Sequence, residues 1–242
     1  LQGNGGKVVV WADDTARVLG SIAARGGALG GDGGRIETSG KRMLEVARAA
    51  DASAPNGQGG LWLLDPNNVT IQTGGPDSNV TGTPPGPIIS TGDSAIVTVA
   101  TIEAALNNGT NVSIFTSAGG AQNGDITVAS AISKTNGGDA TLTLSAHNNI
   151  LVLADIGSTA GALNLVLQAN ADGTGGGISE SYGQITLNGG TLTAQGADLL
   201  LQSGVVRGGT LQTTGGAKAI INSYSNVTFE NMTVAGAVNI SD

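Results

Sequence analysis

The chain has 242 residues, of which 41 are glycine and only 2% are aromatic, and 18 acidic against 10 basic residues give it a net charge of −8. This balance argues against a surface for nucleic acid or for an anionic membrane, because both need clustered lysine and arginine. The chain has no cysteine, which excludes disulfides and thiolate chemistry, and no apolar run reaches the 18 residues of a membrane-spanning helix.

The first part of the chain repeats a glycine pair followed by an apolar run. The pairs are Gly5-Gly6, Gly33-Gly34 and Gly59-Gly60, and their spacing of roughly 26 to 28 residues is typical of repeat architectures. Short apolar runs between glycines indicate strands and tight turns. Each repeat therefore predicts one coil of a solenoid, with a narrow interior of aliphatic rows in place of aromatic packing.

Residues 1–72 are predicted to form glycine-rich coils. Their expected strands are Lys7–Ala12, Ala16–Ala24, Arg35–Thr38, Met43–Ala49 and Val69–Ile71. Residues 41–50 contain good helix formers, but their alternation of apolar and polar side chains favours a strand. Trp11 and Trp62 occupy equivalent places in their repeats, and we interpret both as packing residues.

Residues 73–110 interrupt the repeats. Residues 73–91 hold four prolines and little apolar content, which predicts an excursion from the solenoid wall, and a strand is expected at Ala95–Ala100. A short lateral helix is predicted near 101–108, with Thr101 as its N-cap, Glu103 in its first turn and Asn108-Gly109 at its end.

Residues 111–242 read as regular coils. The expected strands are Asn111–Thr116, Asp125–Ala129, Ala140–Ser145, Asn149–Ala154, Ala162–Ala169, Gln184–Leu187, Gly190–Ala194, Asp198–Gln202, Thr210–Thr213, Ala219–Asn222, Val227–Phe229, Met232–Val234 and Ala237–Ile240. Their alternation places aliphatic side chains inside and Thr, Ser or Asn outside. We therefore predict an all-β fold, a single parallel β-solenoid over 1–242. The chain begins and ends in mid-pattern, so we expect it to be a segment of a longer protein.

Several of these runs are similar to the large filamentous-haemagglutinin-like exoproteins of two-partner secretion. The resemblance rests on Gly-Gly-Lys-Val-Val-Val-Trp-Ala-Asp (5–13), Leu-Leu-Asp-Pro-Asn-Asn-Val-Thr-Ile (63–71) and Gly-Asp-Ala-Thr-Leu-Thr-Leu (138–144). The first two runs are fairly specific, and the resemblance covers most of the chain and is weakest over 73–99. It implies a right-handed parallel β-helix that follows the secretion domain, leaves the cell through an outer-membrane pore, and is secreted or displayed on the cell surface as a fibre. Adhesion and biofilm cohesion are the implied roles, and the ligand on a host cell, bacterial surface or polysaccharide is not named by the sequence.

Candidate contact residues lie in the irregular stretches 73–91 and 173–184, because loops carry function more often than scaffold does. They are Asp77, Asn79, Glu180 and Tyr182.

No catalytic residue, cofactor site or metal site is predicted. His147, the single histidine, would need an orienting partner to act as a base, and the acids nearest to it in sequence are Asp139 and Asp155. Most aspartates are expected at turns. One aspartate in each glycine-rich loop falls short of the six to eight oxygens of a calcium site.

Three other functions stay open. Exposed strand edges at the two ends would allow end-to-end assembly into an extracellular filament. A polysaccharide-acting enzyme would need several acidic or basic side chains in one cleft. An ice-binding solenoid would need one flat threonine face, of which Thr141/Thr143 and Thr191/Thr193 are possible elements.

Overall fold

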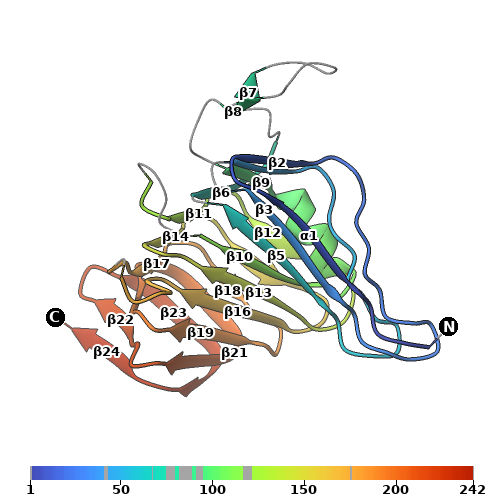
Figure 1. Ribbon diagram of the computed structural model, residues 1–242. Coiled ribbons are helices and arrows are strands. Elements are labelled where there is room, and N and C mark those ends of the chain that lie inside the picture. Colours follow the sequence, from blue (N-terminus) through green and yellow to red (C-terminus); the bar gives the residue numbers. More distant parts are fainter. Residues whose placement is uncertain are drawn as a thin grey trace.

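The computed structural model describes residues 2–40, 43–66, 68–74, 80–81, 89–90, 95–116, 122–174 and 176–241. Over these residues the chain winds as a parallel β-helix, with coils stacked from the N-terminal end to the C-terminal end (Figure 1). Every strand pair of the stack is parallel, so the backbone amides and carbonyls of each coil form hydrogen bonds with those of the next. The predicted β-solenoid is confirmed, and its sheets stay open instead of closing into a barrel.

The larger sheet has twelve strands and forms two walls of the solenoid. In spatial order these are β1 (Lys7–Ala12), β3 (Arg35–Gly40), β5 (Leu61–Pro66), β10 (Asn111–Phe115), β13 (Ala140–Ser145), β16 (Leu163–Gln168), β19 (Thr191–Gln195), β21 (Ser203–Thr214), β18 (Ile185–Thr186), β15 (Ile156–Ser158) and β12 (Ile132–Lys134), with β23 (Asn226–Ala235) paired to β21. The long strand β21 pairs with both β18 and β19 and so joins the two walls.

The second sheet has ten strands and forms the remaining wall. Its order is β2 (Thr15–Val18), β4 (Met43–Val46), β9 (Ala95–Thr98), β6 (Val69–Gln72), β11 (Ile126–Val128), β14 (Ile150–Val152), β17 (Ser179–Ser181), β20 (Leu199–Leu201), β22 (Ala219–Asn222) and β24 (Val238–Ser241). Strands β7 (Val80–Thr81) and β8 (Ile89–Ser90) pair with each other and project from the stack, where the sequence predicted an excursion (Figure 1).

The core consists of aliphatic rows that run along the stack. One row follows the register of the larger sheet through Ile36, Trp62, Val112, Leu142, Leu165, Leu192 and Leu211, and all of them are buried. Strict in-and-out alternation puts every second residue of a strand in such a row. This explains how a chain with few aromatic residues fills its interior.

The repeated glycine pairs lie on top of one another at a corner of the first coils. Gly6, Gly34 and Gly60 precede register-matched residues of β1, β3 and β5. The amide of Arg35 donates to the carbonyl of Gly6, and that of Leu61 to the carbonyl of Gly34, both at 3.0 Å. A Cβ on Gly34 or Gly60 would overlap the carbonyl oxygen of the coil before it. Glycine is therefore required here for close approach of backbones.

The equivalence of Trp11 and Trp62 is wrong. Trp62 is fully buried opposite Ile36, whereas Trp11 is 51% exposed and lies opposite Ser39. Trp11 is the fifth residue after Gly6 and Trp62 the second after Gly60, so the two side chains point to opposite faces of the wall. Only Trp62 packs in the core.

The lateral helix is confirmed, but it begins earlier than expected. Helix α1 spans Val99–Asn107, and its N-cap is Thr98, whose hydroxyl accepts from the amide of Thr101. Glu103 therefore lies beyond the first turn, and the prediction that it stabilises the helix N-terminus is wrong. The predicted end is correct, because Asn108 is the C-cap and Gly109 has a positive φ of 81°.

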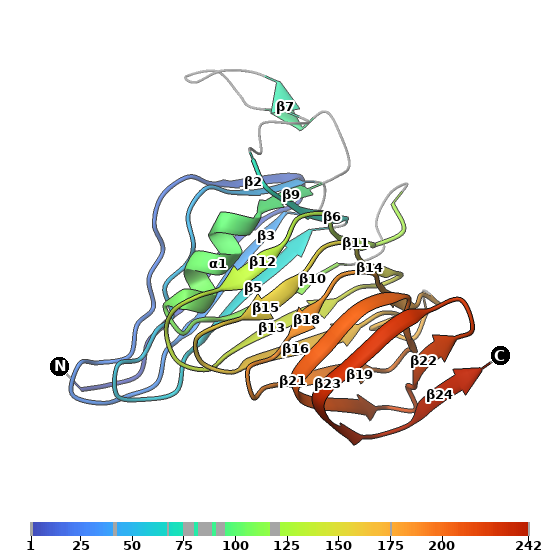
Figure 2. The same ribbon diagram turned by 180° about the vertical axis from the view of Figure 1, so that it is seen from behind.

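The wall that β12, β15 and β18 form is called the third wall. Helix α1 takes the place of a strand there and covers the edge of β12 (Figure 2). The Glu103 carboxylate accepts a hydrogen bond from the backbone amide of Ser133 at 2.7 Å. The side-chain oxygen of Asn107 accepts from the backbone amides of Thr135 and Asn136 at 2.8 and 3.0 Å. These side chains, one turn apart on the helix, replace the carbonyls that a neighbouring strand would offer. An edge that would otherwise be open is thereby satisfied.

Some predicted strands are shorter than expected and others were not foreseen. Ala16–Ala24 holds only β2 and an isolated bridge between Ala23 and Asp51. Met43–Ala49 forms strand β4 over its first four residues, which confirms a strand in place of a helix. The three-residue strands β12, β15 and β17 were missed, because their serines, lysine and glycine hide the apolar alternation.

Two serines of β17 face the core among aliphatic neighbours. Ser179 and Ser181 are buried in register with Ile150 and Val152, and neither hydroxyl has a hydrogen-bond partner in the described structure. An unpaired buried hydroxyl costs about 1–3 kcal/mol. We expect Ser179→Ala and Ser181→Ala each to raise the free energy of unfolding by about 1 kcal/mol, measured by equilibrium denaturation.

Ser158 is the matched control for these two substitutions. It is also buried, but its hydroxyl donates to the carbonyls of Ala160 and Gly161 at 3.0 and 2.8 Å. Ser158→Ala should therefore lower the free energy of unfolding by about 1 kcal/mol. The same sign of change at all three positions would contradict this account.

Candidate binding surfaces

Glu180 and Tyr182, two of the predicted contact residues, lie on the second sheet and not in a loop. Glu180 is the central residue of β17 and Tyr182 follows it, so the loop expected over 173–184 ends at residue 178. The loop prediction failed because Ser179 and Ser181 occupy the inward positions of β17. Asp77 and Asn79, the other two contact residues, lie outside the described residues. A contact role for all four stays a prediction.

Glu180 and Tyr182 form a small polar pair on the outer face of the wall. The Tyr182 hydroxyl donates to the Glu180 carboxylate at 3.3 Å, and Tyr182 is 41% exposed. Partial desolvation and the nearby carboxylate raise the pKa of Tyr182. A shallow hollow of about 210 Å³ lies beside Glu180, lined by Asn149, Ile150, Leu151 and Ile178.

Several aspartates that a catalytic site would need are hydrogen-bonded to the next coil. Their carboxylates accept backbone amide protons at 2.8 Å in four pairs, which are Asp32 with Gln58, Asp139 with Ala162, Asp155 with Gln184 and Asp198 with Lys218. The sequence correctly predicted aspartate at turns. The expected bond to a nearby amide is replaced by one to the turn stacked above, so these carboxylates bind coil to coil.

Asparagine serves the same purpose at the corner before the second sheet. The Asn68 side chain accepts from the amides of Gly124 and Asp125 at 2.8 Å, Asp125 accepts from that of Asn149 at 3.0 Å, and Asn149 accepts from that of Ile178 at 3.0 Å. Four consecutive coils are thus tied by one ladder of side-chain oxygens.

His147 has an acidic partner that sequence distance concealed. Its Nδ1 lies 2.7 Å from the carboxylate of Asp172, which belongs to the turn of the following coil. Hydrogen bonds from the amide and hydroxyl of Thr174, and then from His147, lower the pKa of Asp172 to about 2. His147 borders a polar hollow of about 360 Å³ that is also lined by Gln122, Asn123, Asn148 and Thr174. The acids nearest in sequence, Asp139 and Asp155, are engaged elsewhere.

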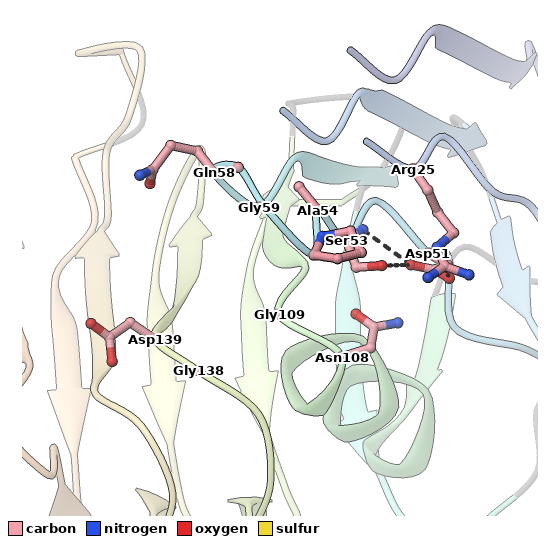
Figure 3. Close-up of a pocket in the computed structure, with 12 residues that line it drawn as sticks. Arg25, Asp51, Ser53, Ala54, Gln58, Gly59, Asn108, Gly109, Gly138 and Asp139 are labelled. Atoms are coloured by element: carbon pink, nitrogen blue, oxygen red, sulfur yellow. Dashed lines mark hydrogen bonds and ion pairs between the residues drawn. The ribbon is translucent and has the colours of Figure 1, made fainter. Parts of the chain in front are cut away.

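A groove lies on the third wall, where α1 ends (Figure 3). It has a volume of about 810 Å³ and is lined by Arg25, Asp51, Ser53, Ala54, Pro55, Gly57, Gln58, Gly59, Asn108, Gly109, Gly138 and Asp139. Figure 3 shows Arg25, Asp51 and Ser53 close together above Asn108, with Asp139 apart from them. Sequence reasoning missed this groove, because its lining comes from turns of separate coils that only the stacking register brings together.

The polar groups of this groove are partly committed to one another. Arg25 Nε lies 3.5 Å from the Asp51 carboxylate, which also accepts from the amide and hydroxyl of Ser53 at 3.0 and 2.6 Å. Gln58 and Asp139 add an amide and a carboxylate side chain to a lining rich in glycine. Such a mixture suits a ligand held by hydrogen bonds more than one held by apolar contact.

The threonine rows considered for ice binding are interrupted. In the coil after β13, Asn164 stands opposite Thr141 and Val166 opposite Thr143, and Val166 in turn stands opposite Thr193. The outward face of this wall therefore mixes amide, aliphatic and hydroxyl groups. Across the described ranges, no three His, Cys, Asp or Glu side chains gather as a metal site requires, and no helix has the length and apolar character to cross a membrane.

Lys134 is a buried cation in the wall of β12. It is fully buried, and its ammonium group donates to the carbonyls of Asn136 at 2.7 Å, Gly137 at 3.4 Å and Ala160. All three of its donors are thus satisfied by two adjacent turns. Burial lowers the pKa of Lys134, and the negative charge of Asp139 opposes part of that effect.

The lowered pKa of Lys134 predicts that the free energy of unfolding rises with pH in the alkaline range. Between the lowered pKa and the unfolded value of about 10.4, the unfolded chain binds more protons than the folded one, so the free energy of unfolding increases with pH. Lys134→Met should remove that increase, as measured by denaturation from pH 7 to 10.5. Lys218→Met, at an exposed lysine, is the control and should keep it. An unchanged slope in Lys134→Met would contradict the assignment.

Comparison with known proteins adds no family to this description. No family model matches the chain, and no curated protein is significantly similar to it in sequence.

Proposed function

We propose that this chain is a stiff segment of a secreted or surface-displayed bacterial exoprotein of the filamentous-haemagglutinin-like kind, which presents binding surfaces for attachment or biofilm cohesion. The observation that carries the proposal is the unbroken stack of parallel coils, in which backbone ladders and side-chain ladders tie each coil to the next. A stack of coils tied in this way is stiff along its axis. The sequence runs at 5–13 and 63–71 add the resemblance.

The way the acids are used supports a scaffold more than an enzyme. Carboxylates that accept backbone amides from the next coil are committed to holding the stack, as Asp125 and Asp155 are. The groove on the third wall and the Glu180–Tyr182 pair are the surfaces that such a rod would offer to a partner on a cell or on a polysaccharide.

Location is the sharpest test of this proposal. Antibodies raised against the 242-residue chain are applied to intact cells, lysed cells and culture medium of the source bacterium, with a cytoplasmic enzyme as marker. We expect label on intact cells or in the medium, and loss of both when the outer-membrane pore partner is deleted. Label that appears only after lysis would contradict export and therefore the proposal.

A second candidate function is end-to-end assembly into a filament. Among the described strands, β1 and β2 at one end and β23 and β24 at the other pair on one side only. Apolar side chains are exposed there, with Ile240 at 78% and Val234 at 48%. Unpaired edges with apolar side chains can accept further coils, whether from the same chain or from a second copy.

Electron microscopy at several protein concentrations separates the two candidates. Filaments that lengthen with concentration would favour assembly, and discrete particles would favour a segment within a longer rod. Ile240→Lys should block filament growth by placing a charge at the open end. Leu153→Lys, at a residue 49% exposed on the side of the stack, is the control and should leave growth unchanged.

A further inference from the structure

Chain order and spatial order disagree at one place in the second sheet. Along the sheet the order is β4, β9, β6, β11, although β6 precedes β9 in the chain. Residues 1–72 supply β4 and β6, and residues from 95 onward supply β9 and β11. Strands from the two parts of the chain therefore alternate, and each part holds a strand that lies between two strands of the other.

Strand β9 and helix α1 fill a gap that the first part leaves open. Glu45 and Val46 of β4 pair with Ile96 and Val97 on one side of β9, and β6 pairs along its whole length on the other. Without β9, both strands would present unpaired amides and carbonyls to one another across a missing strand.

The fit of this segment is close. Val97 of β9 and Ile102 and Leu106 of α1 are fully buried. The hydroxyl of Thr101 donates to the carbonyl of Val46 at 3.4 Å. On the following turn, the hydroxyl of Thr110 accepts from the buried amide of Ala52 at 2.9 Å. The contacts thus combine a strand ladder, an apolar face and side-chain hydrogen bonds from both parts.

The connection between β6 and β9 is much longer than the path requires. The two strands are parallel neighbours, so the chain needs only to return along one short strand and across one inter-strand spacing. Residues 73–94 can reach several times that distance, because an extended chain covers about 3.3–3.6 Å per residue. A connection of this length keeps its two ends at a high local concentration.

We propose that residues 1–72 and 95–241 are two interlocking modules, and that the space between β4 and β6 is a strand-acceptor site. Its occupant is a segment with apolar residues at alternate positions followed by an amphipathic helix, which is β9–α1 of the same chain or of a second copy. Main-chain ladders provide the affinity in this mode of recognition, and the alternate side chains provide the specificity. The proposal goes beyond the fibre function and does not depend on it.

One consequence concerns folding of a chain whose N-terminal residues become available first. Strands β4 and β6 both lack their shared partner β9 until residues 95–107 arrive, so the first coils stay open until then. The acceptor site is exposed in that interval, which is when a second copy can enter it.

Cleavage of the full chain tests the interlock. A protease site replaces residues 82–88, the protein is folded and then cut, and the product is examined by size-exclusion chromatography. We expect one native species that contains both pieces. Tenfold dilution should lower the denaturation midpoint of the cut protein but not that of the uncut protein, because only the cut protein dissociates on unfolding. Separation of the pieces without denaturant would overturn the proposal.

Substitutions in β9 test whether this strand holds the two modules together. Val97→Lys puts a charge in the core, and Ile96→Lys puts the same charge on the outer face opposite Glu45. After the cut we expect the Val97→Lys pieces to separate and the Ile96→Lys pieces to stay together. Val97→Ala, a milder change, should raise the dissociation constant of the cut protein at least tenfold. If the pieces of the Val97→Lys and Ile96→Lys variants separate to the same extent, β9 does not hold the two modules together.

Exchange between copies tests the acceptor site. Cut protein labelled with ¹⁵N is mixed with unlabelled cut protein, and native mass spectrometry follows the masses over time. Hybrid species that combine a labelled and an unlabelled piece are expected. If only the parental masses persist under conditions where the cut protein dissociates and reassembles, the site does not accept a second copy and that part of the proposal is wrong.

Discussion

Gly34→Ala is expected to lower the free energy of unfolding by about 3 kcal/mol or more, which is the upper range for forced overpacking. An added Cβ would overlap the carbonyl oxygen of Gly6 and lie 2.7 Å from the carbonyl carbon of Gly5. Both are backbone atoms of residues that are hydrogen-bonded to the next coil just before β1 and β3 begin, so neither can turn aside as a side chain would. Relief requires the two coils to move apart and to lose hydrogen bonds.

Gly6→Ala is the matched control, because Gly6 is the register partner of Gly34 in the preceding coil. A Cβ there meets nothing within 4 Å. The change should therefore alter the free energy of unfolding by less than about 1 kcal/mol, with stabilisation the expected sign since alanine restricts the unfolded chain. Equilibrium denaturation of both variants, followed by circular dichroism, measures the difference. Equal destabilisation of the two variants would mean that the overlap at Gly34 is not the cause.

The parts of the fold that the sequence predicts are those with local signals. Glycine pairs recur where one coil approaches the next, and alternating runs such as Ala140–Ser145 place leucines inward. Both signals depend only on residues near one another in the chain. The register within the stack then follows, because shifting a strand by one residue would turn its apolar side chains outward.

The insertion of β9 between β4 and β6 has no local signal. Its residues alternate as any strand of this wall does, and nothing in that pattern names the neighbours. Core positions held by Lys134, Ser179 and Ser181 were hidden for a related reason, since polar residues at inward positions break the alternation on which strand prediction rests.

Candidate sites were the least predictable part of the molecule. His147 and Asp172 are 25 residues apart, about one coil, and only stacking brings them together. The groove at the end of α1 likewise gathers turns from separate coils. A single sequence shows which residues lie at turns, but the choice of stacked partner depends on coil length, and coil length changes where α1 replaces a strand.

Trp62→Ala is expected to cost about 3–5 kcal/mol of unfolding free energy. The side chain is fully buried between Ile36 and Val112 in the main aliphatic row, and its indole nitrogen donates to the hydroxyl of Thr38 in the preceding coil at 3.1 Å. Truncation leaves a cavity and also removes the partner of a buried hydroxyl. Neighbouring coils cannot collapse into the space without breaking their own ladders, which places the cost toward the upper end of that range.

Trp11→Ala separates burial from aromatic character. Trp11 is 51% exposed on the outer face of β1, so its loss should change the free energy of unfolding by no more than about 1 kcal/mol. Trp62→Phe completes the series, because it keeps most of the volume but gives up the hydrogen bond to Thr38. Its cost, measured by the same denaturation experiment, should fall between those of the two alanine variants. A Trp11→Ala cost as large as that of Trp62→Ala would contradict the assignment of Trp62 alone to the core, and with it the register that sets β1 against β3 and β5.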